Sequence, residues 1–270
     1  MSESKREITG ILEEMTLDQV RLLRAEVVVL PIGSTEPHGP HLPYGTDTFQ
    51  ADAVSRRAVT AANRAGGRVL MYPALPISNN VNFKAFPFAA RVSVRTLMNV
   101  VLDIVEALEQ DGVKKIVLVN GHGGNTDTLK AAIREHVSRH PPDAGAFVCM
   151  VTSASFVPAE IGKLIEHGSD HAGEYETSCV MHLRPELVRQ EKFDLFPQRQ
   201  PELPALRGGD VFFVRPWHGY VPASAGGETR KSSADKGKAL IDGAAQGLAK
   251  FLVELSNTPW QAKFPYAAGE

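Results

Sequence analysis

Short segments that are apolar on both faces alternate along this chain with longer segments that have the periodicity of amphipathic helices. Residues 27–32 show the apolar pattern most clearly, as a strand in the middle of a parallel sheet does. The whole pattern predicts strands over 27–32, 69–73, 115–119 and 146–152, and helices over 16–24, 47–65, 93–110, 126–140 and 235–255. This alternation predicts an α/β fold with a mainly parallel central sheet flanked by helices.

Two glycine-rich loops directly follow predicted strands. Residues 33–47 follow the first strand, and residues 120–125 follow the third. Parallel sheets of this kind bind ligands beyond the carboxyl ends of their strands. The sequence therefore predicts a functional site at the edge of the sheet where these loops lie.

The first loop, GSTEPHGPHLPYGTD, carries several side chains of the types that bind divalent metals. Glu36 and His38 are two residues apart, so in an extended loop they point to the same side, and Asp47 lies where a helix is expected to begin. His41 is a candidate for hydrogen bonding a ligand rather than binding metal itself. The alternative interpretation is a polar loop followed by a helix-capping aspartate.

Two further segments carry ionisable residues. His122 lies in the loop NGHGGN, which lacks both the P-loop pattern and the dinucleotide-binding pattern, and a tight turn with an incidental histidine is the alternative. The segment from Asp170 to Ser178 holds His171, Glu174 and Glu176 at the expected start of a helix. In isolation its acidic residues would stabilise the first turn of that helix. Near a metal, one glutamate could be a ligand and His171 a proton carrier.

Composition excludes several classes of protein. The formal net charge of −2 gives no electrostatic footprint for nucleic acid, and no apolar run reaches the length needed to span a membrane. Only Cys149 and Cys179 are present, so a reducing, cytoplasmic setting is the simpler expectation. We expect one domain over residues 1–270, with an N-terminal arm at 1–15 and a C-terminal tail at 256–270 whose aromatic residues pack on the body or on another subunit.

Three motifs together resemble the creatininase family of metal-dependent amidohydrolases. They are GSTEPHGPHLPYGTD, NGHGGN and HAGEYETS, in this order, and the resemblance covers most of residues 25–255. It implies a three-layer α/β sandwich and a centre of two divalent metal ions, Zn²⁺, Mn²⁺ or Fe²⁺. By motif, Glu36, His38, Asp47 and His122 become metal ligands, with Asp47 as the bridge. The resemblance also implies homo-oligomers, often hexamers.

One ligand position departs from the family pattern. Creatininase takes a ligand from a glutamate two residues after the histidine of its N-G-H motif, and this sequence has Gly124 there. Glu176 is the candidate to replace that ligand, and Glu174 is the runner-up. His171 matches the proposed general acid/base of the family, with Asp170 as a candidate to orient its imidazole.

The expected chemistry is attack of a metal-bound hydroxide on a carbonyl, with His171 relaying the proton. The favoured substrate is a small cyclic amide or a formamide. The alternatives are hydrolytic ring opening of an oxidised cyclitol such as a keto-inosose, and a non-catalytic metal-binding scaffold. Residues 74–91 and 207–231 depart from the family where a pocket should be shaped. Residues that could line a polar pocket, or simply lie on the surface, are Arg207, Arg215, Trp217 and His218.

Overall fold

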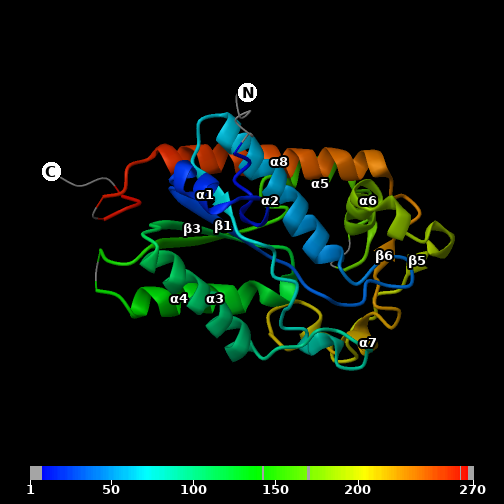
Figure 1. Ribbon diagram of the computed structural model, residues 1–270. Coiled ribbons are helices and arrows are strands. Elements are labelled where there is room, and N and C mark those ends of the chain that lie inside the picture. The colour runs from blue at the N-terminus through cyan, green and yellow to red at the C-terminus, as the bar shows by residue number, and fades with distance from the viewer. Residues whose placement is uncertain (1–7, 142, 169–170, 262, 267–270) are drawn as a thin grey trace.

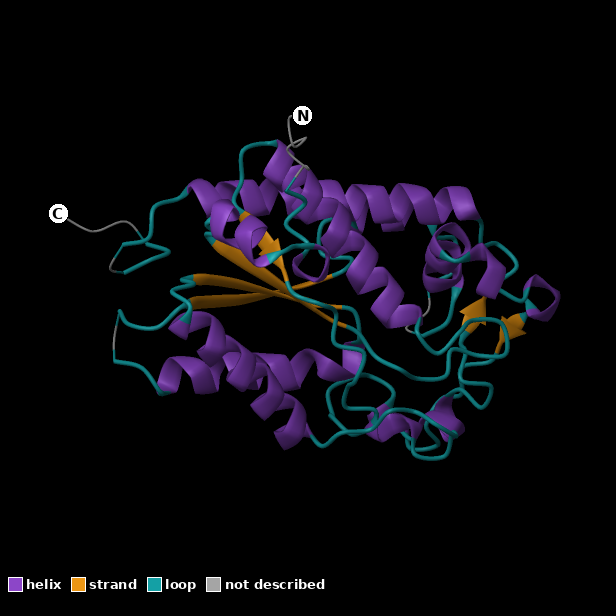
Figure 2. Cartoon of the chain, in the orientation of Figure 1, coloured by secondary structure: helices purple, strands orange, loops and turns teal. Residues whose placement is uncertain are grey.

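The computed structural model of the chain describes residues 8–141, 143–168, 171–261 and 263–266. A four-stranded sheet with the order β2-β1-β3-β4 forms the middle layer, and all its strands are parallel (Figures 1 and 2). The strands are β1 (Val27–Ile32), β2 (Val69–Met71), β3 (Lys115–Asn120) and β4 (Phe147–Thr152). The predicted α/β fold with a parallel central sheet is confirmed.

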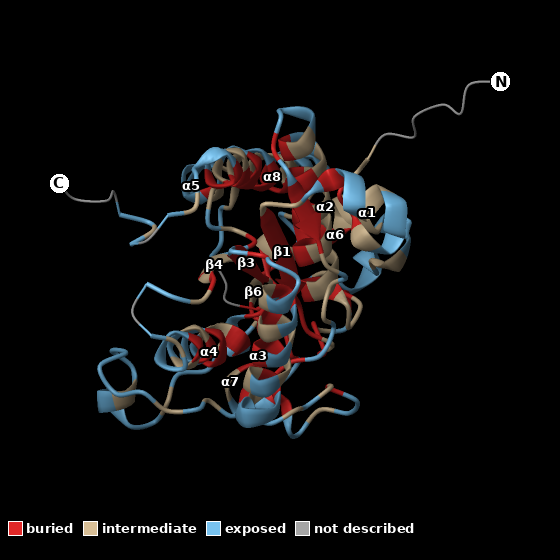
Figure 3. Ribbon diagram, turned by 60° about the vertical axis from the view of Figure 1, so that its left-hand side comes forward, coloured by how far each residue is buried: buried red, intermediate tan, exposed pale blue. Residues whose placement is uncertain are grey.

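Helices cover both faces of the sheet. In Figure 1, α2 (Thr46–Arg64) and α8 (Ala234–Asn257) lie above it, and α3 (Val94–Gln110) and α4 (Thr126–Ser138) lie below. Side chains of β1 alternate between the two cores, because successive residues of a strand point to opposite faces. Val29 packs in the cluster with α2 and α8, whereas Leu30 packs in the cluster with α3. Figure 3 shows these buried inner faces around the sheet.

The order of the strands places a crevice at the site loops. The chain moves from β1 to β2 on one side, and then crosses to β3 on the other side of β1. The strand order therefore reverses between β1 and β3, where α/β sheets characteristically bind ligands. Ile32 pairs with Asn120 at this end, and Gly121 N–H donates to the carbonyl of Ile32 at 2.8 Å. The two glycine-rich loops thus start side by side.

Several segments depart from the predicted pattern or add to it. The remaining helices are α1 (Leu17–Leu23), α5 (Pro158–Leu164), α6 (Glu174–Leu183) and α7 (Trp217–Tyr220). Of these, α5 and α7 have no counterpart among the predictions. Two short strands, β5 (Leu195–Phe196) and β6 (Gly227–Glu228), form a separate antiparallel pair in the region without periodicity. Near the N-terminus, Ile11 is buried and bridges to Met71 beside β2.

The C-terminal tail is only partly packed. The ring of Phe264 contacts the ring of Phe147 with centroids 5.1 Å apart, as expected for a packed tail. Tyr266 is 78% exposed, so its predicted packing is absent within this chain. Within the described ranges, no helix combines the length and apolar character needed to cross a bilayer.

Lys115 joins the sheet to the end of α8, and its removal is expected to lower stability. It is fully buried, and its Nζ donates to the carbonyls of Leu255 at 2.8 Å and Thr258 at 2.5 Å. These bonds satisfy carbonyl groups at the negative end of the helix dipole. Lys115→Met keeps the apolar stem but should lower the free energy of unfolding by about 2 kcal/mol. Chemical denaturation of Lys114→Met, at an exposed neighbour, should match the native protein.

Candidate metal centre

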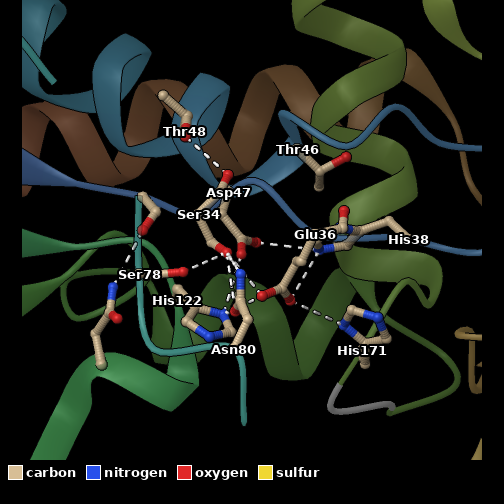
Figure 4. A network of polar contacts seen from close by, with 12 residues as sticks. Ser34, Glu36, His38, Thr46, Asp47, Thr48, Ser78, Asn80, His122 and His171 are labelled. Carbon is tan, nitrogen blue, oxygen red and sulfur yellow. Dashed lines mark hydrogen bonds and ion pairs between the residues drawn. The ribbon is translucent and has the colours of Figure 1, made fainter. Parts of the chain in front are cut away.

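Three segments bring the five predicted ligands together. Glu36 and His38 come from the loop after β1, and Asp47 lies in the first turn of α2. His122 comes from the loop after β3, and Glu176 lies in the first turn of α6. Glu36, His38, Asp47 and His122 are buried, and the Glu176 side chain is 20% exposed. Figure 4 shows the first four pointing toward one another.

The side chains form two groups that share Asp47. In the first, His122 Nδ1 lies 3.1 Å from Glu36 Oε2 and 3.1 Å from Asp47 Oδ2. In the second, His38 Nε2 lies 3.1 Å from Asp47 Oδ1 and 3.9 Å from Glu176 Oε2. In each group the potential ligand atoms lie within 4.8 Å of one another. Each group therefore has the size and ligand types of a site for a divalent ion.

The electrostatics of the cluster favour a bound cation. Burial lowers the pKa of His38, but the negative charges of Asp47, Glu176 and Glu36 outweigh it and raise the pKa to about 10. Burial also works against protonation of His122, yet Glu36 and Asp47 raise its pKa well above the ordinary value. Without a metal, imidazolium rings thus supply the positive charge that the buried carboxylates need. Metal ions would meet the same need, so the residues fit a metal centre.

Asp47 and Glu176 respond in opposite ways to the same surroundings. Burial works against ionisation of Asp47, but the adjacent His38 and His122 hold its pKa below the usual range. Burial raises the pKa of Glu176 to about 7, against the attraction of His38. Asp47 Oδ2 also faces His122 without the alignment of a hydrogen bond. Asp47 Oδ2 and the facing nitrogen of His122 are therefore placed to bind one ion together.

A network of small polar side chains, missed in the sequence, holds Glu36. Ser34 Oγ donates to Glu36 Oε2 at 2.7 Å and accepts from Ser78 Oγ at 2.7 Å and Asn80 Nδ2 at 2.9 Å (Figure 4). These bonds fix the carboxylate, as partners beyond the metal ligands do in metal sites. Ser34 was detectable by its position two residues before Glu36. Ser78 and Asn80 had no signal beyond their place in the irregular segment 74–91.

His171 lies beside the cluster with its tautomer set by the backbone. Its Nε2 is 2.9 Å from the carbonyl of Pro37, which can only accept, so Nε2 carries the hydrogen. Nδ1 lies 3.8 Å from Glu36 Oε1. Burial and the nearby charge of His38 hold the pKa of His171 well below its ordinary value, so the ring is neutral. His171 also forms a group with Glu36 and His38 that could bind metal. Asp170, predicted to orient it, lies outside the described residues.

His41 is close to the cluster without belonging to any of its ligand groups. Its Nε2 lies 3.0 Å from Thr177 Oγ1 on α6, and its ring stacks on Phe196 at 5.4 Å. Burial and the charge of His38 lower the pKa of His41 to about 4. His41 therefore connects the first loop to the helix of Glu176 as a neutral ring. Its side-chain hydrogen bond goes to Thr177 and not, as predicted, to one of the candidate ligands.

The geometry distinguishes Glu176 from Glu174. Glu174 is fully buried away from the ligand groups, and its carboxylate accepts from the backbone N–H of Glu166 and His167 and from Lys236 Nζ. Gly124 leaves no room for the ligand that creatininase carries there, because a Cβ would lie 2.4 Å from His122 Nε2. Of the two glutamates, Glu176 is the one that forms a potential ligand group with His38 and Asp47.

Paired variants separate the roles of these two glutamates. Glu176→Gln should lower the metal content and leave the fold nearly as stable, because it removes one ligand from the cluster. Glu174→Ala should keep the metal content and lower the free energy of unfolding by about 3 kcal/mol, because it leaves Lys236 without its buried partner. Metal analysis and denaturation of both proteins test this. Loss of metal from the Glu174 variant alone would reverse the assignment.

A second group of ligand-type residues lies at the other edge of the sheet. It consists of Glu109, His136 and His140. Glu109 accepts from Ala146 N–H, and His136 Nε2 lies 3.1 Å from the carbonyl of Ala146. These contacts attach α3 and α4 to the chain just before β4, which gives the group a structural role.

A cavity of about 650 Å³ opens over the cluster of candidate metal ligands, called the metal cluster below. Its walls include Phe83 from the segment 74–91 and Trp217 from the segment 207–231. Both segments therefore shape the pocket, as predicted. Arg215 also lines this cavity, whereas His218 does not. The ring centroids of Trp217 and His171 are 5.7 Å apart, so the apolar wall reaches the predicted proton carrier.

The fold and this cluster define an α/β metal-dependent hydrolase. The chain belongs to the creatininase family: the family model described as creatinine amidohydrolase matches residues 13–252. This confirms the resemblance of the three motifs.

Relatives in the family act on different substrates. The chain is 34% identical to the mycofactocin precursor peptide peptidase of Mycobacterium ulcerans over 70% of this chain and 72% of that one. It is 29% identical to creatinine amidohydrolase of Pseudomonas putida, over 84% and 89%. It is 28% identical to 3-dehydro-scyllo-inosose hydrolase of Thermotoga maritima, over 96% and 88%.

Solved structures agree with the fold. A candidate creatinine amidohydrolase from Bacteroides fragilis superimposes with a TM-score of 0.84 at 28% identity, covering 95% of this chain and 100% of that one. Creatininase superimposes with a TM-score of 0.74 at 26% identity, over 93% and 99%. Other creatininase structures are described with Mn and as a Zn–Zn type.

Proposed function

We propose that this chain hydrolyses an amide C–N bond with the help of two divalent metal ions, Zn²⁺, Mn²⁺ or Fe²⁺. Glu36, Asp47 and His122 would hold one ion, and His38, Asp47 and Glu176 the other. The observation that carries this proposal is that the two ligand groups share Asp47 at the floor of a cavity. Bound there, the ions would polarise a carbonyl and activate water at neutral pH.

His171 would serve as the general base and then as the general acid. Its hydrogen is held on Nε2 by the carbonyl of Pro37, so Nδ1 can accept a proton from the attacking water. The same atom would then return the proton to the leaving nitrogen. Ser224 Oγ lies 3.3 Å from Nε2 and donates to the same Pro37 carbonyl, which keeps the ring oriented. A role for Asp170 in this orientation remains part of the proposal.

The substrate class is supported by the relatives and by the cavity. We propose a cyclic amide or a formamide as the first candidates, and the peptidase relative extends the class to peptide bonds. A hydrolysis screen over creatinine, N-formyl amines and short peptides, with each metal supplied in turn, tests the proposal. Turnover of at least one amide is expected. A metal-loaded protein that hydrolyses none of them would overturn it.

A second candidate is hydrolytic ring opening of a keto-inosose. The inosose hydrolase relative is aligned over 96% of this chain, and the cavity includes the polar side chains of Asn79, Asn82 and Asp127. Such groups suit a ligand with many hydroxyls. Including a keto-inosose in the same screen decides between the two reactions. A chain that binds no metal after careful purification would instead support the non-catalytic scaffold.

Metal loading is expected to release protons and to weaken as the pH falls. In the metal-free protein, the raised pKa values of His38, about 10, and of His122 keep both rings protonated at neutral pH. A metal binds only the neutral ring, so each ligand histidine must lose its proton. Calorimetric titration with Zn²⁺ in buffers of different ionisation enthalpy measures this release. Identical heats in all buffers would contradict the predicted protonation.

The setting, domain organisation and assembly of the chain complete the proposal. Cys149 and Cys179 form no disulfide with each other, which suits a reducing cytoplasm. We propose a single domain over residues 1–270 and a homo-oligomer, with the hexamer as the first assembly to test. Light scattering of the purified protein measures its mass directly.

A further inference from the structure

A second cavity of about 690 Å³ adjoins the cavity over the metal cluster. The two share Phe212, Phe213 and Arg215 as lining residues, so the stretch before α7 forms a common wall. A cavity of either size already suits a drug-sized ligand, for which about 300–1,000 Å³ is usual. Together they exceed what a small cyclic amide occupies.

The second cavity has a positively charged lining. Three arginines line it, Arg199, Arg207 and Arg215, and no aspartate or glutamate among the described residues belongs to its lining. The rest of the wall is largely apolar, with Leu206, Phe212 and Tyr220. Guanidinium groups match the geometry of carboxylates and phosphates, which they bind in bidentate fashion. The lining therefore suits an anionic group attached to an apolar body.

Two of the arginines are held in place by the protein. Arg215 lies over the rings of Trp217 and Tyr220, at 4.7 Å and 4.4 Å from their centroids. Trp217 reaches the metal-site cavity and Tyr220 the second one, so Arg215 lies at the junction. Arg207 Nε donates to the carbonyl of Pro201 at 2.7 Å. Pre-positioned charges of this kind lower the entropy cost of binding.

We propose that the substrate spans both cavities, with its scissile amide over the metal cluster and a carboxylate or phosphate in the arginine-lined cavity. This inference rests on the proposed amide hydrolysis, and it narrows the substrate class to amides that carry a remote anionic group and an apolar portion. Arg199, Arg207 and Arg215 then determine specificity without contacting the reacting bond.

Ligand-observed NMR with three small probes tests the second cavity directly. The probes are N-acetylphenylalanine, its neutral carboxamide and phenyl phosphate, which share an aromatic body. We expect at least one anionic probe to bind about tenfold more tightly than the carboxamide. Binding of only one of them identifies a carboxylate or a phosphate as the anion. Equal affinities for all three, or no saturable binding of either anion up to about 10 mM, would overturn the inference.

A double variant connects this binding to the cavity. Arg199→Met with Arg207→Met should weaken the anionic probe about tenfold, because two guanidinium groups are lost. Arg139→Met is the matched control, since Arg139 pairs with Glu106 and Glu135 on the surface and lines neither cavity. The affinity of the Arg139→Met protein for the anionic probe should equal that of the native chain. Unchanged binding in the double variant would also overturn the inference.

The design separates this inference from the proposed function. Titrations run first on chelator-treated protein, where no metal can bind the anion, and then on the metal-loaded protein. If the anionic probes bound through the arginines but no amide was hydrolysed, the second cavity would still be an anion-binding site and the proposed reaction would be overturned. If the protein hydrolysed neutral amides and showed no preference for their anionic counterparts, the proposed reaction would stand and the inference about the second cavity would be overturned.

Discussion

Asp47→Asn is expected to lose both metal ions and to lower kcat/KM by at least about a thousandfold. Asp47 Oδ1 faces His38, and Oδ2 faces His122, so one carboxylate serves both ligand groups. Asparagine has nearly the same shape but offers a single neutral oxygen, so each group loses one of its two carboxylates. A thousandfold loss of kcat/KM corresponds to losing several kcal/mol of charge stabilisation in the transition state. Metal analysis by mass spectrometry and steady-state kinetics on any substrate found in the screen measure both effects.

The matched control lies on the same helix. Asp52→Asn changes a carboxylate one turn further along α2 that bonds to Arg56 Nε at 2.9 Å, away from the cluster. It should keep the native metal content and rate. Glu176→Gln provides a graded comparison, because Glu176 belongs to only one of the two groups that share Asp47. Native metal content and rate in the Asp47 variant would show that Asp47 does not hold the ions.

His171→Asn should lower kcat by about a hundredfold to ten-thousandfold and leave the metal content unchanged. The expected loss is that of a positioned general acid and base. Asparagine is uncharged and cannot take up a proton, so the proton transfer that His171 is proposed to carry out is lost. Metal analysis is the decisive second measurement, because His171 also lies near Glu36 and His38. If the variant lost metal, His171 would be a ligand and the proton carrier would have to be sought elsewhere.

A second histidine variant controls for general effects on the protein. His140→Asn changes a partly exposed ring at the other edge of the sheet, in the structural group with Glu109 and His136. It should leave kcat and metal content unchanged. A loss of rate equal to that of the His171 variant would mean that the effect is not specific to the site.

The central layers of the fold were predictable because their signals are local. The strand over residues 27–32 and the capped helix that follows Ser93 both have the predicted bounds to within one residue. Strands buried on both faces need uninterrupted apolar residues, and a surface helix needs one apolar stripe, so each leaves a pattern in the sequence. α5 left no such pattern, and none of its residues is fully buried.

The supporting residues of the site were much harder to predict. Ser78 and Asn80 contact Ser34 across more than forty positions of sequence, within an irregular segment that has no period. The choice between Glu174 and Glu176 was open for a related reason. They lie two residues apart on one helix, and the partner that separates them, Lys236, lies on α8. No local pattern records such a long-range contact.

By itself, the sequence determined the central parallel sheet, the helices that flank it and the candidates for metal ligands, because apolar periodicity and short motifs are properties of neighbouring residues. Only the tertiary structure decided that His171 holds its hydrogen against the Pro37 carbonyl and that arginines line a second cavity. Each of these depends on how loops from different parts of the chain pack against one another. Contacts between segments distant in sequence exist only once the chain has folded.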